Sequence, residues 1–445
     1  MIKLPQPVTD TIQKLTKAKF EAYVVGGSVR DLLLGLTTNN WDLTTNATPE
    51  EIQKLFPDSF YNNEFGTVGV PVKNEQGETA TVLEITTYRS EKGYSDRRRP
   101  DQVIWGDSLE KDLSRRDFTV NAIAYDGKNL IDPFNGQKDL DARIIRTVGD
   151  AKTRFSEDAL RLLRAIRIGA KLGFTIDEHT FHAIKENAQL IENVSPDRVR
   201  SELMNLLAGD HPADGIMLLK NAGLLHEILP EVERGFGIPQ KSPKRHHIYD
   251  VGTHLVMSLH NCPSTNPLVR FATLLHDVGK PDVFHKDDAS GLITFYNHEV
   301  VGAKIVKEIA YRLNFSKKDR EKLITLVRWH QFTVDENQTD ATLRRFIKRV
   351  GKENLKDMLD LRIGDRLGGG ARETSWRLRL FMARLEEVQK QPFTVADLKV
   401  SGHDVMKLLN LQPGPEVGKV LNELFNEVVM EKIPNEREAL LAKIK

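Results

Sequence analysis

The sequence AYVVGGSVRDLLL occupies residues 22–34 and places two glycines between an apolar run and an amphipathic segment. The apolar run is typical of a short strand, and the segment after the glycines has helical spacing. Gly26 and Gly27 let the backbone approach an anion closely, where the N–H groups at the start of a helix donate. Arg30 would add a cationic donor. This arrangement predicts a phosphate-binding turn; a tight turn without a ligand is the alternative.

Oxygen-bearing side chains follow at residues 40–44, which we expect to form a strand. Asn40 and Asp42 would project from one face of it, because side chains repeat every two residues along a strand. Glu84, in the apolar run at residues 82–86, is the candidate for a third oxygen ligand; a solvated strand glutamate is the alternative. Such oxygens beside a phosphate turn suit Mg²⁺ and nucleotidyl transfer.

Two further strand-like runs, at residues 66–72 and 80–87, are separated by turn residues typical of a hairpin. They predict a small mixed sheet, preceded by a helix over residues 8–19. From about Thr153 the strand signals cease and helical periodicity dominates. The helices expected there span residues 159–172, 177–190, 197–207 and 212–222.

A family resemblance rests on four motifs: GGSVRD at residues 26–31, WDLTTNATPE at 41–50, RRDFTVNA at 115–122 and SEDALRLLRAIR at 156–167. In this order and spacing, the chain resembles the bacterial and eukaryotic (class II) CCA-adding enzymes and the bacterial poly(A) polymerases. Both belong to the polymerase-β-like nucleotidyltransferase superfamily. The resemblance implies an α+β fold, with a nucleotidyltransferase head that contains a small mixed sheet, followed by all-helical neck, body, HD and tail regions.

The same resemblance implies roles for the motif residues. Gly26, Gly27 and Arg30 would hold phosphates and Asp42 a metal ion, with Asn40 and Glu84 as the other catalytic candidates. Arg116 would meet the triphosphate charge, with Asp117 and Asn121 of the same motif also binding nucleotide. Asp158 and Arg161 would read the Watson–Crick edge of the incoming CTP or ATP, and Arg164 and Arg167 would line the same groove.

The base-reading role is chemically reasonable for a helix that begins near Asp158. Positions 158, 161 and 164 would share one face at i, i+3 spacing. A carboxylate accepts from the amino group that cytosine and adenine both carry, and arginine donates in a fixed fork. An amphipathic helix with ordinary salt pairs is the alternative.

Position 40 departs from the family pattern, which has aspartate there. An amide oxygen can coordinate Mg²⁺ but brings no charge, which costs several kcal/mol of transition-state stabilisation. We interpret Asn40 as a substitution that impairs an otherwise competent enzyme. A natural variant with altered metal use is the competing interpretation.

A second constellation lies in the C-terminal half, where the adjacent pair His276-Asp277 sits in an apolar run. Such a pair is costly to bury without a partner, and a metal ion would be one. The ligand pattern resembles that of HD-family phosphohydrolases, which implies Mn²⁺, Fe²⁺, Ni²⁺ or Mg²⁺ and phosphatase or phosphodiesterase chemistry. Lys280 either orients a phosphate or stabilises a helix end. The implied ligands are His254, His276, Asp277 and Asp365, with His298 and His330 where some members hold a second ion.

The 445 residues predict several units, joined in part by a polar linker at residues 235–245. We expect a catalytic head at 1–150, a helical neck and body at 151–235, an HD domain at 245–370 and a tRNA-binding helical tail at 371–445. The single cysteine excludes an internal disulfide framework, and without a signal peptide or long apolar stretch we expect a cytoplasmic protein with no membrane partner.

The predicted function is the template-independent addition of C, C and A to the 3′ end of tRNA from CTP and ATP. Poly(A) polymerase or A-only addition is one alternative, and a non-catalytic RNA-binding protein, supported by Asn40, is another. The net charge of +1 does not exclude an RNA partner, because basic clusters are present; the sequence leaves the oligomeric state open. The expected partner is tRNA, through its acceptor stem and 3′ end, and the predicted contacts to RNA are Arg344, Arg345, Arg372, Arg377 and Arg379.

Overall fold

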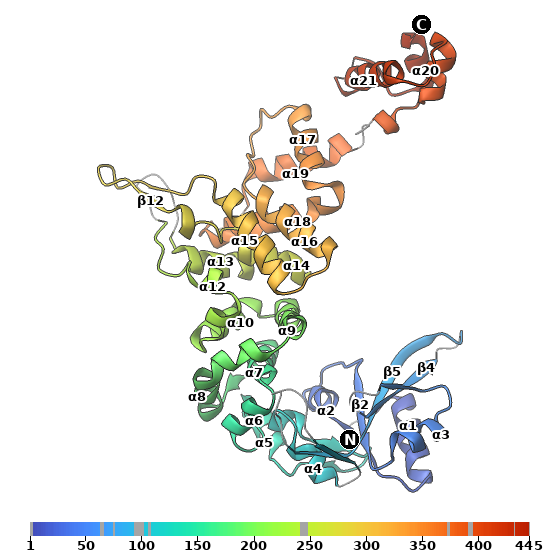
Figure 1. Cartoon of the computed structure of the whole chain (residues 1–445), viewed down its shortest axis with the longest axis vertical. Helices are drawn as coiled ribbons and strands as arrows, with labels where there is room; N and C mark the ends of the chain where they lie inside the picture. Colours follow the sequence, from blue (N-terminus) through green and yellow to red (C-terminus); the bar gives the residue numbers. More distant parts are fainter. Residues whose placement is uncertain are drawn as a thin grey trace. The chain divides into compact units, whose positions relative to one another are not determined.

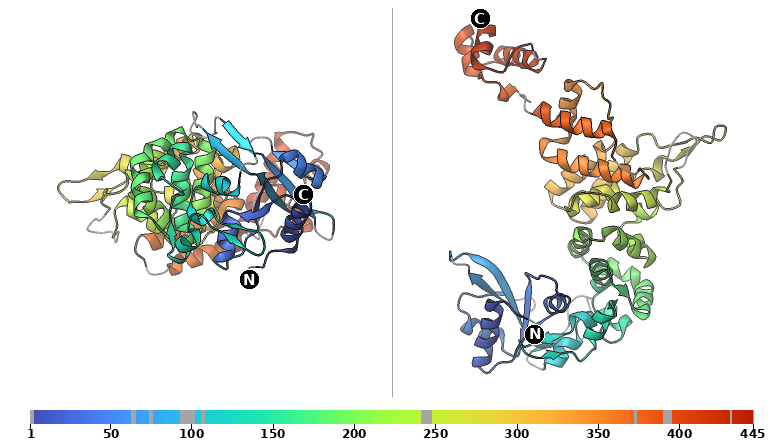
Figure 2. Two further views of the ribbon diagram at one scale, coloured as in Figure 1. Left: turned by 90° about the horizontal axis from the view of Figure 1, so that it is seen from below. Right: turned by 180° about the vertical axis from the view of Figure 1, so that it is seen from behind.

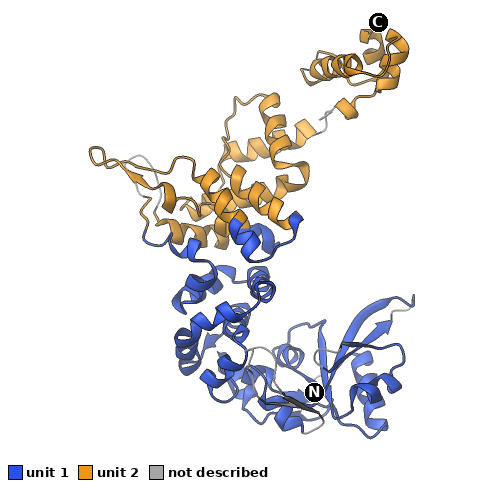
Figure 3. Cartoon of the chain, viewed as in Figure 1, with its two compact units in different colours: residues 1–237, 265–271, 308–317 blue, residues 238–264, 272–307, 318–445 orange. Residues whose placement is uncertain are grey.

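The computed structural model describes residues 3–62, 66–73, 76–92, 102–105, 108–240, 248–371, 374–389, 395–430 and 432–444. These residues form two compact units (Figure 3). Unit 1 comprises residues 1–237, 265–271 and 308–317, and unit 2 comprises residues 238–264, 272–307 and 318–445. In the described residues, no helix combines the length and the apolar character that crossing a membrane requires.

A seven-stranded mixed sheet forms the centre of the head in unit 1, with strand order β3-β4-β5-β2-β1-β8-β9 (Figure 1). Neighbouring strands are antiparallel except β2 and β5, which are parallel. The expected small mixed sheet and the β4–β5 hairpin are therefore confirmed. The strands are β1 Ala22–Val25, β2 Trp41–Thr45, β3 Phe60–Asn62, β4 Thr67–Lys73, β5 Thr79–Thr87, β8 Ala124–Tyr125 and β9 Leu130–Ile131, and a separate pair is β6 Arg89–Lys92 with β7 Gln102–Trp105.

Short helices flank this sheet. Figures 1 and 2 show α1 and α3 together on one side of β2 and α2 on the other. Helix α3 begins with a capping box, in which Thr48 and Glu51 each bond to the other's backbone N–H. The head helices are α1 Gln6–Lys17, α2 Gly27–Leu33, α3 Pro49–Leu55, α4 Leu109–Ser114, η1 Thr119–Asn121 and α5 Gly136–Asp141.

The chain becomes mainly helical after the head, as expected, although short strands occur there too, including the pair β12 (His285–Lys286) and β13 (Ile293–Thr294) in unit 2. A short strand, β11 Thr175–Ile176, pairs in parallel with β10 Ile144–Ile145, so strand structure does not end at Thr153. A two-residue strand carries too little alternation to be detected in the sequence. The helices are α6 Ala151–Glu157, α7 Leu160–Leu172, α8 Glu178–Asn187, η2 Ala188–Asn193, α9 Pro196–Ala208, α10 Pro212–Asn221, α11 Leu224–Ile228 and α12 Pro230–Glu233.

Unit 2 is built around close packing of two helices, α13 and α18. At Gly368 of α18, an added Cβ would lie 2.4 Å from the backbone nitrogen of Ser258, so only glycine allows this approach. The elements are α13 Val251–His260, α14 Pro267–Leu275, η3 Pro281–Val283, β12 His285–Lys286, β13 Ile293–Thr294, α15 His298–Arg312, α16 Lys317–Trp329, α17 Asp340–Val350, η4 Lys352–Asn354, α18 Leu355–Gly368 and α19 Trp376–Gln389, with α14, α15 and α16 shared between the units.

The C-terminal segment has an apolar core of its own, which includes Val405, Leu424 and Leu440. The capping box expected of a helix start is present at Ser401 and Asp404, and Asp404 also pairs with Arg437 at 2.5 Å. Its elements are η5 Val395–Asp397, α20 Gly402–Leu409, α21 Pro415–Val429 and α22 Arg437–Ile444. Part of the expected linker, residues 241–245, lies outside the described residues.

Candidate functional site

The turn between β1 and α2 brings a carboxylate and a guanidinium together. Gly26 has a φ of +76°, which glycine adopts without strain. A Cβ at this position would lie 3.2 Å from Nη1 of Arg116 and 3.3 Å from Oδ2 of Asp42. Side chains from β2 and from the segment after α4 therefore meet at the glycine turn. A metal ion held by Asp42 could contact a phosphate in this turn only if Asp42 lies this close to Gly26.

Asp42 has a second carboxylate as its neighbour. It is paired with Glu84 in the parallel ladder of β2 and β5, so both side chains project from the same face. Burial raises the pKa of Asp42, and Arg116 and Arg164 partly offset that effect. The pKa of the more exposed Glu84 is raised by burial and then by the charge of Asp42. Two such carboxylates repel one another, and a divalent cation between them would remove that repulsion.

Asn40 is exposed and lies one residue before β2 begins. Its backbone carbonyl accepts a hydrogen bond from Oγ1 of Thr38 at 3.1 Å. The expectation that positions 40 and 42 share a strand therefore holds only for Asp42. Whether the amide of Asn40 contributes to an ion site stays a prediction.

A buried aspartate, Asp112, orients the guanidinium at the turn. Its carboxylate accepts from Arg115 at 2.6 Å and from Arg116 at 3.3 Å. Burial raises the pKa of Asp112, but the two arginines outweigh burial and the net pKa is lowered. Asp112 was missed by the sequence analysis, although its place four residues before Arg116 on a helix was a usable signal.

Arg30 and Asn121 form the other wall of the turn. Arg30 is only 6% exposed; it donates to Oδ1 of Asn121 at 2.8 Å and to its neighbour Asp31 at 2.8 Å. Asn121 donates in turn to Oδ1 of Asp117 at 3.0 Å. The structure thus places Arg30, Asn121 and Asp117 in one buried chain of hydrogen bonds beside the glycines.

Asp117 extends this chain to helix α7. Its Oδ2 accepts from Nε of Arg164 at 2.8 Å and pairs with Nη2 at 2.6 Å. Burial raises the pKa of Asp117, but Arg164 and Asn121 outweigh it and hold the pKa well below its usual range. Arg164 also lies 3.8 Å from Glu202, which pairs with Arg167 at 2.5 Å. The head and α7 are therefore joined by a continuous ionic network.

The two expected base-reading residues are held by ion pairs. Asp158 pairs with Arg198 at 2.8 Å, and Arg161 pairs with Glu157 at 2.7 Å and donates to the carbonyl of Arg115 at 3.1 Å. Asp158 has an extended backbone, with φ of −144° and ψ of 103°, because it lies at the junction of α6 and α7. The expected helix therefore begins at Leu160, and the helical-face argument does not apply to Asp158.

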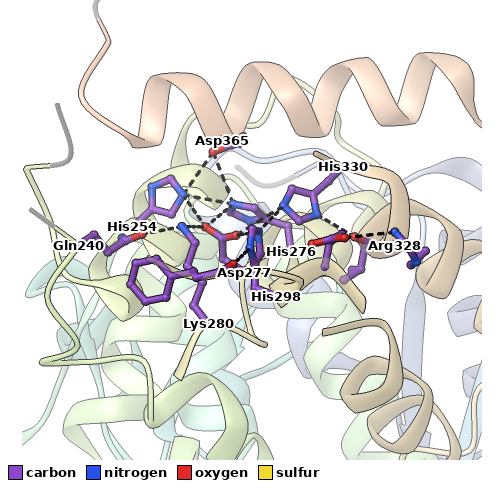
Figure 4. A network of polar contacts seen from close by, with 12 residues as sticks. Gln240, His254, His276, Asp277, Lys280, His298, Arg328, His330 and Asp365 are labelled. Carbon is purple, nitrogen blue, oxygen red and sulfur yellow. Dashed lines mark hydrogen bonds and ion pairs between the residues drawn. The ribbon is translucent and has the colours of Figure 1, made fainter. Parts of the chain in front are cut away.

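Unit 2 contains the His–Asp cluster drawn in Figure 4. Nε2 of His254 and Nε2 of His276 lie 3.2 Å apart, and each lies 3.3 Å from Oδ2 of Asp277. Asp365 approaches the same two nitrogens at 3.3 and 3.5 Å. The four expected ligands His254, His276, Asp277 and Asp365 therefore lie together in the folded chain.

The other oxygen of Asp277 faces two further histidines. Its Oδ1 lies 3.1 Å from Nε2 of His298 and 3.5 Å from Nε2 of His330. The Nδ1 atoms of His276, His298 and His330 each lie 2.7 Å from a backbone carbonyl three residues earlier. Those bonds place the ring proton on Nδ1, so the Nε2 lone pairs converge on the cluster.

Lys280 and Gln240 lie at the edge of the cluster. Nζ of Lys280 contacts Oδ2 of Asp277 at 2.5 Å and donates to Oε1 of Gln240 at 2.6 Å (Figure 4). Both side chains are buried. Gln240 was missed by the sequence analysis, because it precedes the cluster by many residues and carries no pattern.

The arginines predicted to contact RNA differ in their surroundings. Arg344 is 8% exposed, whereas Arg345 is exposed on the same helix. Arg377 pairs with Glu336 at 2.6 Å, and Arg379 donates to the carbonyl of Thr374 at 3.4 Å. Arg372 lies outside the described residues. Their contacts to RNA stay a prediction.

Comparisons with known proteins identify the family of the chain. Three family models match: "Poly A polymerase head domain" at residues 22–146, "Probable RNA and SrmB- binding site of polymerase A" at 173–236, and "tRNA nucleotidyltransferase domain 2 putative" at 295–444. The CCA-adding enzyme of Streptococcus mutans is 32% identical over 98% of this chain and 96% of its own length. The chain belongs to the CCA-adding tRNA nucleotidyltransferase family.

Another relative in the family is the A-adding tRNA nucleotidyltransferase of Deinococcus radiodurans, 35% identical over 94% of each chain. Among solved structures, the CCA-adding enzyme of Bacillus stearothermophilus in complex with CTP superimposes with a TM-score of 0.71. It is 27% identical and covers 99% of this chain and 97% of its own. The expected α+β nucleotidyltransferase fold is confirmed.

Four charged residues that the sequence analysis missed pair with the predicted nucleotide-binding residues. Asp112, Glu157, Arg198 and Glu202 pair with Arg116, Arg161, Asp158 and Arg167 respectively. Each is an ordinary charged residue on a helix, and sequence alone does not distinguish it from a solvated one.

Proposed function

We propose that this chain adds C, C and A to the 3′ end of tRNA from CTP and ATP without a nucleic-acid template. The observation that carries the proposal is the meeting of Asp42 and Arg116 at the Gly26 turn, with Glu84 beside Asp42 on the neighbouring strand. The relative from S. mutans is a CCA-adding enzyme, and the structure from B. stearothermophilus is a complex with CTP. Both support the same reaction.

Nucleotidyl transfer in this family uses divalent metal ions, and we assign Mg²⁺ to the oxygens of Asp42, Glu84 and Asn40. A bound ion supplies charge neutralisation at the reacting phosphate and lowers the pKa of the attacking 3′ hydroxyl. The backbone N–H groups after Gly26 would receive a phosphate, and Arg116, oriented by Asp112, would meet the triphosphate charge.

Base selection would be performed by Asp158 and Arg161. The ion pairs with Arg198 and Glu157 hold both side chains before a nucleotide arrives, which lowers the entropic cost of reading the base. Arg164 and Arg167 line the adjoining part of α7 and are fixed by Asp117 and Glu202. A carboxylate and a guanidinium can address the amino-bearing edge of either C or A.

A second candidate activity for the same site is the addition of A alone, and the A-adding relative from D. radiodurans favours it. The test uses tRNA that lacks its terminal CCA and tRNA that ends in CC, each incubated with labelled CTP, labelled ATP or both. We expect CTP incorporation first and ATP incorporation only after two C residues. Incorporation of A alone, and only on tRNA that already ends in CC, would identify an A-adding enzyme.

The His–Asp cluster supports a second candidate function, a metal-dependent phosphohydrolase. The observation that favours it is the convergence of buried Nε2 atoms on both oxygens of Asp277. Buried imidazole lone pairs at these distances repel unless a proton or a cation lies between them. We propose a site for Mn²⁺, Fe²⁺, Ni²⁺ or Mg²⁺, which His254, His276, Asp277, Asp365 and His330 would hold.

Metal binding and hydrolysis are tested separately. Metal content after dialysis and calorimetric titration with Mn²⁺ or Ni²⁺ should show binding that His276→Ala removes. Metal-stimulated release of phosphate from RNA ends should be lost in the same variant. Stoichiometric metal with no hydrolysis would leave a structural metal site, and no metal uptake would exclude both.

A further inference from the structure

A basic and aromatic pocket lies beside the His–Asp cluster in unit 2. It encloses about 510 Å³, within the range of small-ligand sites, and its walls come from α15, α16, α17 and α19. Its charged lining residues are Arg328, Arg345, Arg349 and Glu299. The lining therefore carries an excess of positive charge.

Two of these arginines lie over the ring of Trp329. The guanidinium of Arg328 lies 4.3 Å and that of Arg349 lies 5.2 Å from the Trp329 ring. A guanidinium that stacks on a ring keeps its N–H edge available for an oxygen ligand. Arg328 has one weak ion pair, at 3.5 Å to Glu299, and in the described part of the chain Arg349 has no acidic partner.

The rest of the wall is aromatic. The ring of Phe332 stacks on Phe381 at 5.2 Å and contacts Phe346 at 4.7 Å. Trp329 and Phe332 are both partly exposed. A half-exposed aromatic wall next to guanidinium edges matches the two parts of a nucleotide, a flat base and a phosphate.

The pocket also adjoins the cluster. Trp329 precedes His330 in the chain and Phe332 follows it by two residues, Glu299 follows His298, and Figure 4 shows Arg328 close to His330. A ligand in the pocket would therefore lie next to the proposed metal ligands.

We propose that this pocket binds a nucleotide unit of single-stranded RNA, with Arg345 and Arg349 on the phosphates and the base on the wall formed by Trp329 and Phe332. This proposal rests on the proposed function only because it takes RNA as the ligand, and RNA binding in the pocket requires no bound metal. A free mononucleotide carries the same chemistry, so the test has to separate the two sources.

The test uses the full chain in EDTA and a fluorescein-labelled hexacytidylate, with binding followed by anisotropy over a range of salt concentrations. Arg349→Gln and Arg345→Gln should each weaken binding about tenfold and reduce the slope of log K against log salt by about 0.7. Lys348→Gln, an exposed cation of the same helix outside this pocket, is the matched control and should leave binding unchanged.

Trp329→Phe gives an independent measurement, because it keeps an aromatic ring and should preserve the fold. Quenching of tryptophan fluorescence by unlabelled hexacytidylate should be much smaller in this variant than in the wild type. Equal quenching in both proteins, or equal weakening in Lys348→Gln and Arg349→Gln, would overturn the proposal.

Competition separates the ligand sources. Hexacytidylate should compete far better than CMP or inorganic phosphate; equal competition by CMP would assign the pocket to a free mononucleotide and overturn the RNA assignment. CTP and ATP incorporation into tRNA, measured on the same wild-type preparation, reports on the proposed function alone. Failure of incorporation with intact oligonucleotide binding would refute the transfer reaction and leave the pocket in place.

Discussion

Asp117→Asn is the sharpest test of the ionic network that joins the head to α7. One oxygen of Asp117 accepts from Phe118 N at 2.8 Å and from Asn121 at 3.0 Å, and the other accepts from Arg164. An asparagine has one acceptor oxygen and one amino group. In either orientation its amino group faces donors, so two hydrogen bonds are lost and buried donors are left unsatisfied.

The expected loss of stability follows from those bonds. Breaking a buried pair costs about 3–5 kcal/mol, and the partial exposure of Arg164 and its contact with Glu202 lower this to about 2–4 kcal/mol. For a unit of this size, the melting temperature should fall by about 5–10 °C. Because Arg164 would lose its orientation, kcat/KM for CTP should fall by about tenfold or more.

The assay combines scanning calorimetry with CTP incorporation into tRNA. Asp139→Asn is the matched control, because Asp139 is also buried and accepts from Thr119 at 2.7 Å and from Arg146 at 3.2 Å, away from α7. It should lower stability with little effect on kcat/KM. If Asp117→Asn stays within about 1 kcal/mol of the wild type, or Asp139→Asn loses as much activity, the network does not position the nucleotide site.

Three further predictions test other parts of the molecule. Asn40→Asp should raise CTP incorporation at saturating Mg²⁺ at least tenfold, because it restores one ligand charge; an unchanged rate would contradict our interpretation of Asn40. Gly368→Ala should lower the free energy of unfolding of unit 2 by about 2 kcal/mol or more in urea, because the alanine Cβ would overlap Ser258. A smaller effect would mean that α13 can shift away from α18 at little cost. Asp112 has a lowered pKa in the folded state, so its stabilisation is present above the unfolded pKa of about 3.9 and is lost as pH falls below it. Asp112→Asn should therefore flatten the decline of the urea midpoint between about pH 5 and pH 2; an unchanged decline would show that other carboxylates control acid unfolding.

Local elements and family membership could both be predicted from the order of the residues. Residues 22–34 specify a strand, a turn and a helix through apolar periodicity and two glycines, and β1 and α2 lie where that pattern places them. The motifs identified the nucleotidyltransferase family, because their order and spacing belong to the sequence and do not depend on how the chain folds. Local pattern failed at Asp158, which was expected to share one helical face with Arg161 and Arg164 but has an extended backbone between α6 and α7.

Which distant side chains meet depends on the packing of the folded chain. The parallel pairing of β2 with β5 sets Asp42 beside Glu84, and the approach of α18 to α13 sets Asp365 beside His254. No periodicity records such contacts, because they depend on packing between segments far apart in the chain. The stacking of Arg349 on Trp329 is another such contact. It forms part of the pocket wall, and neither residue indicates a pocket in the sequence.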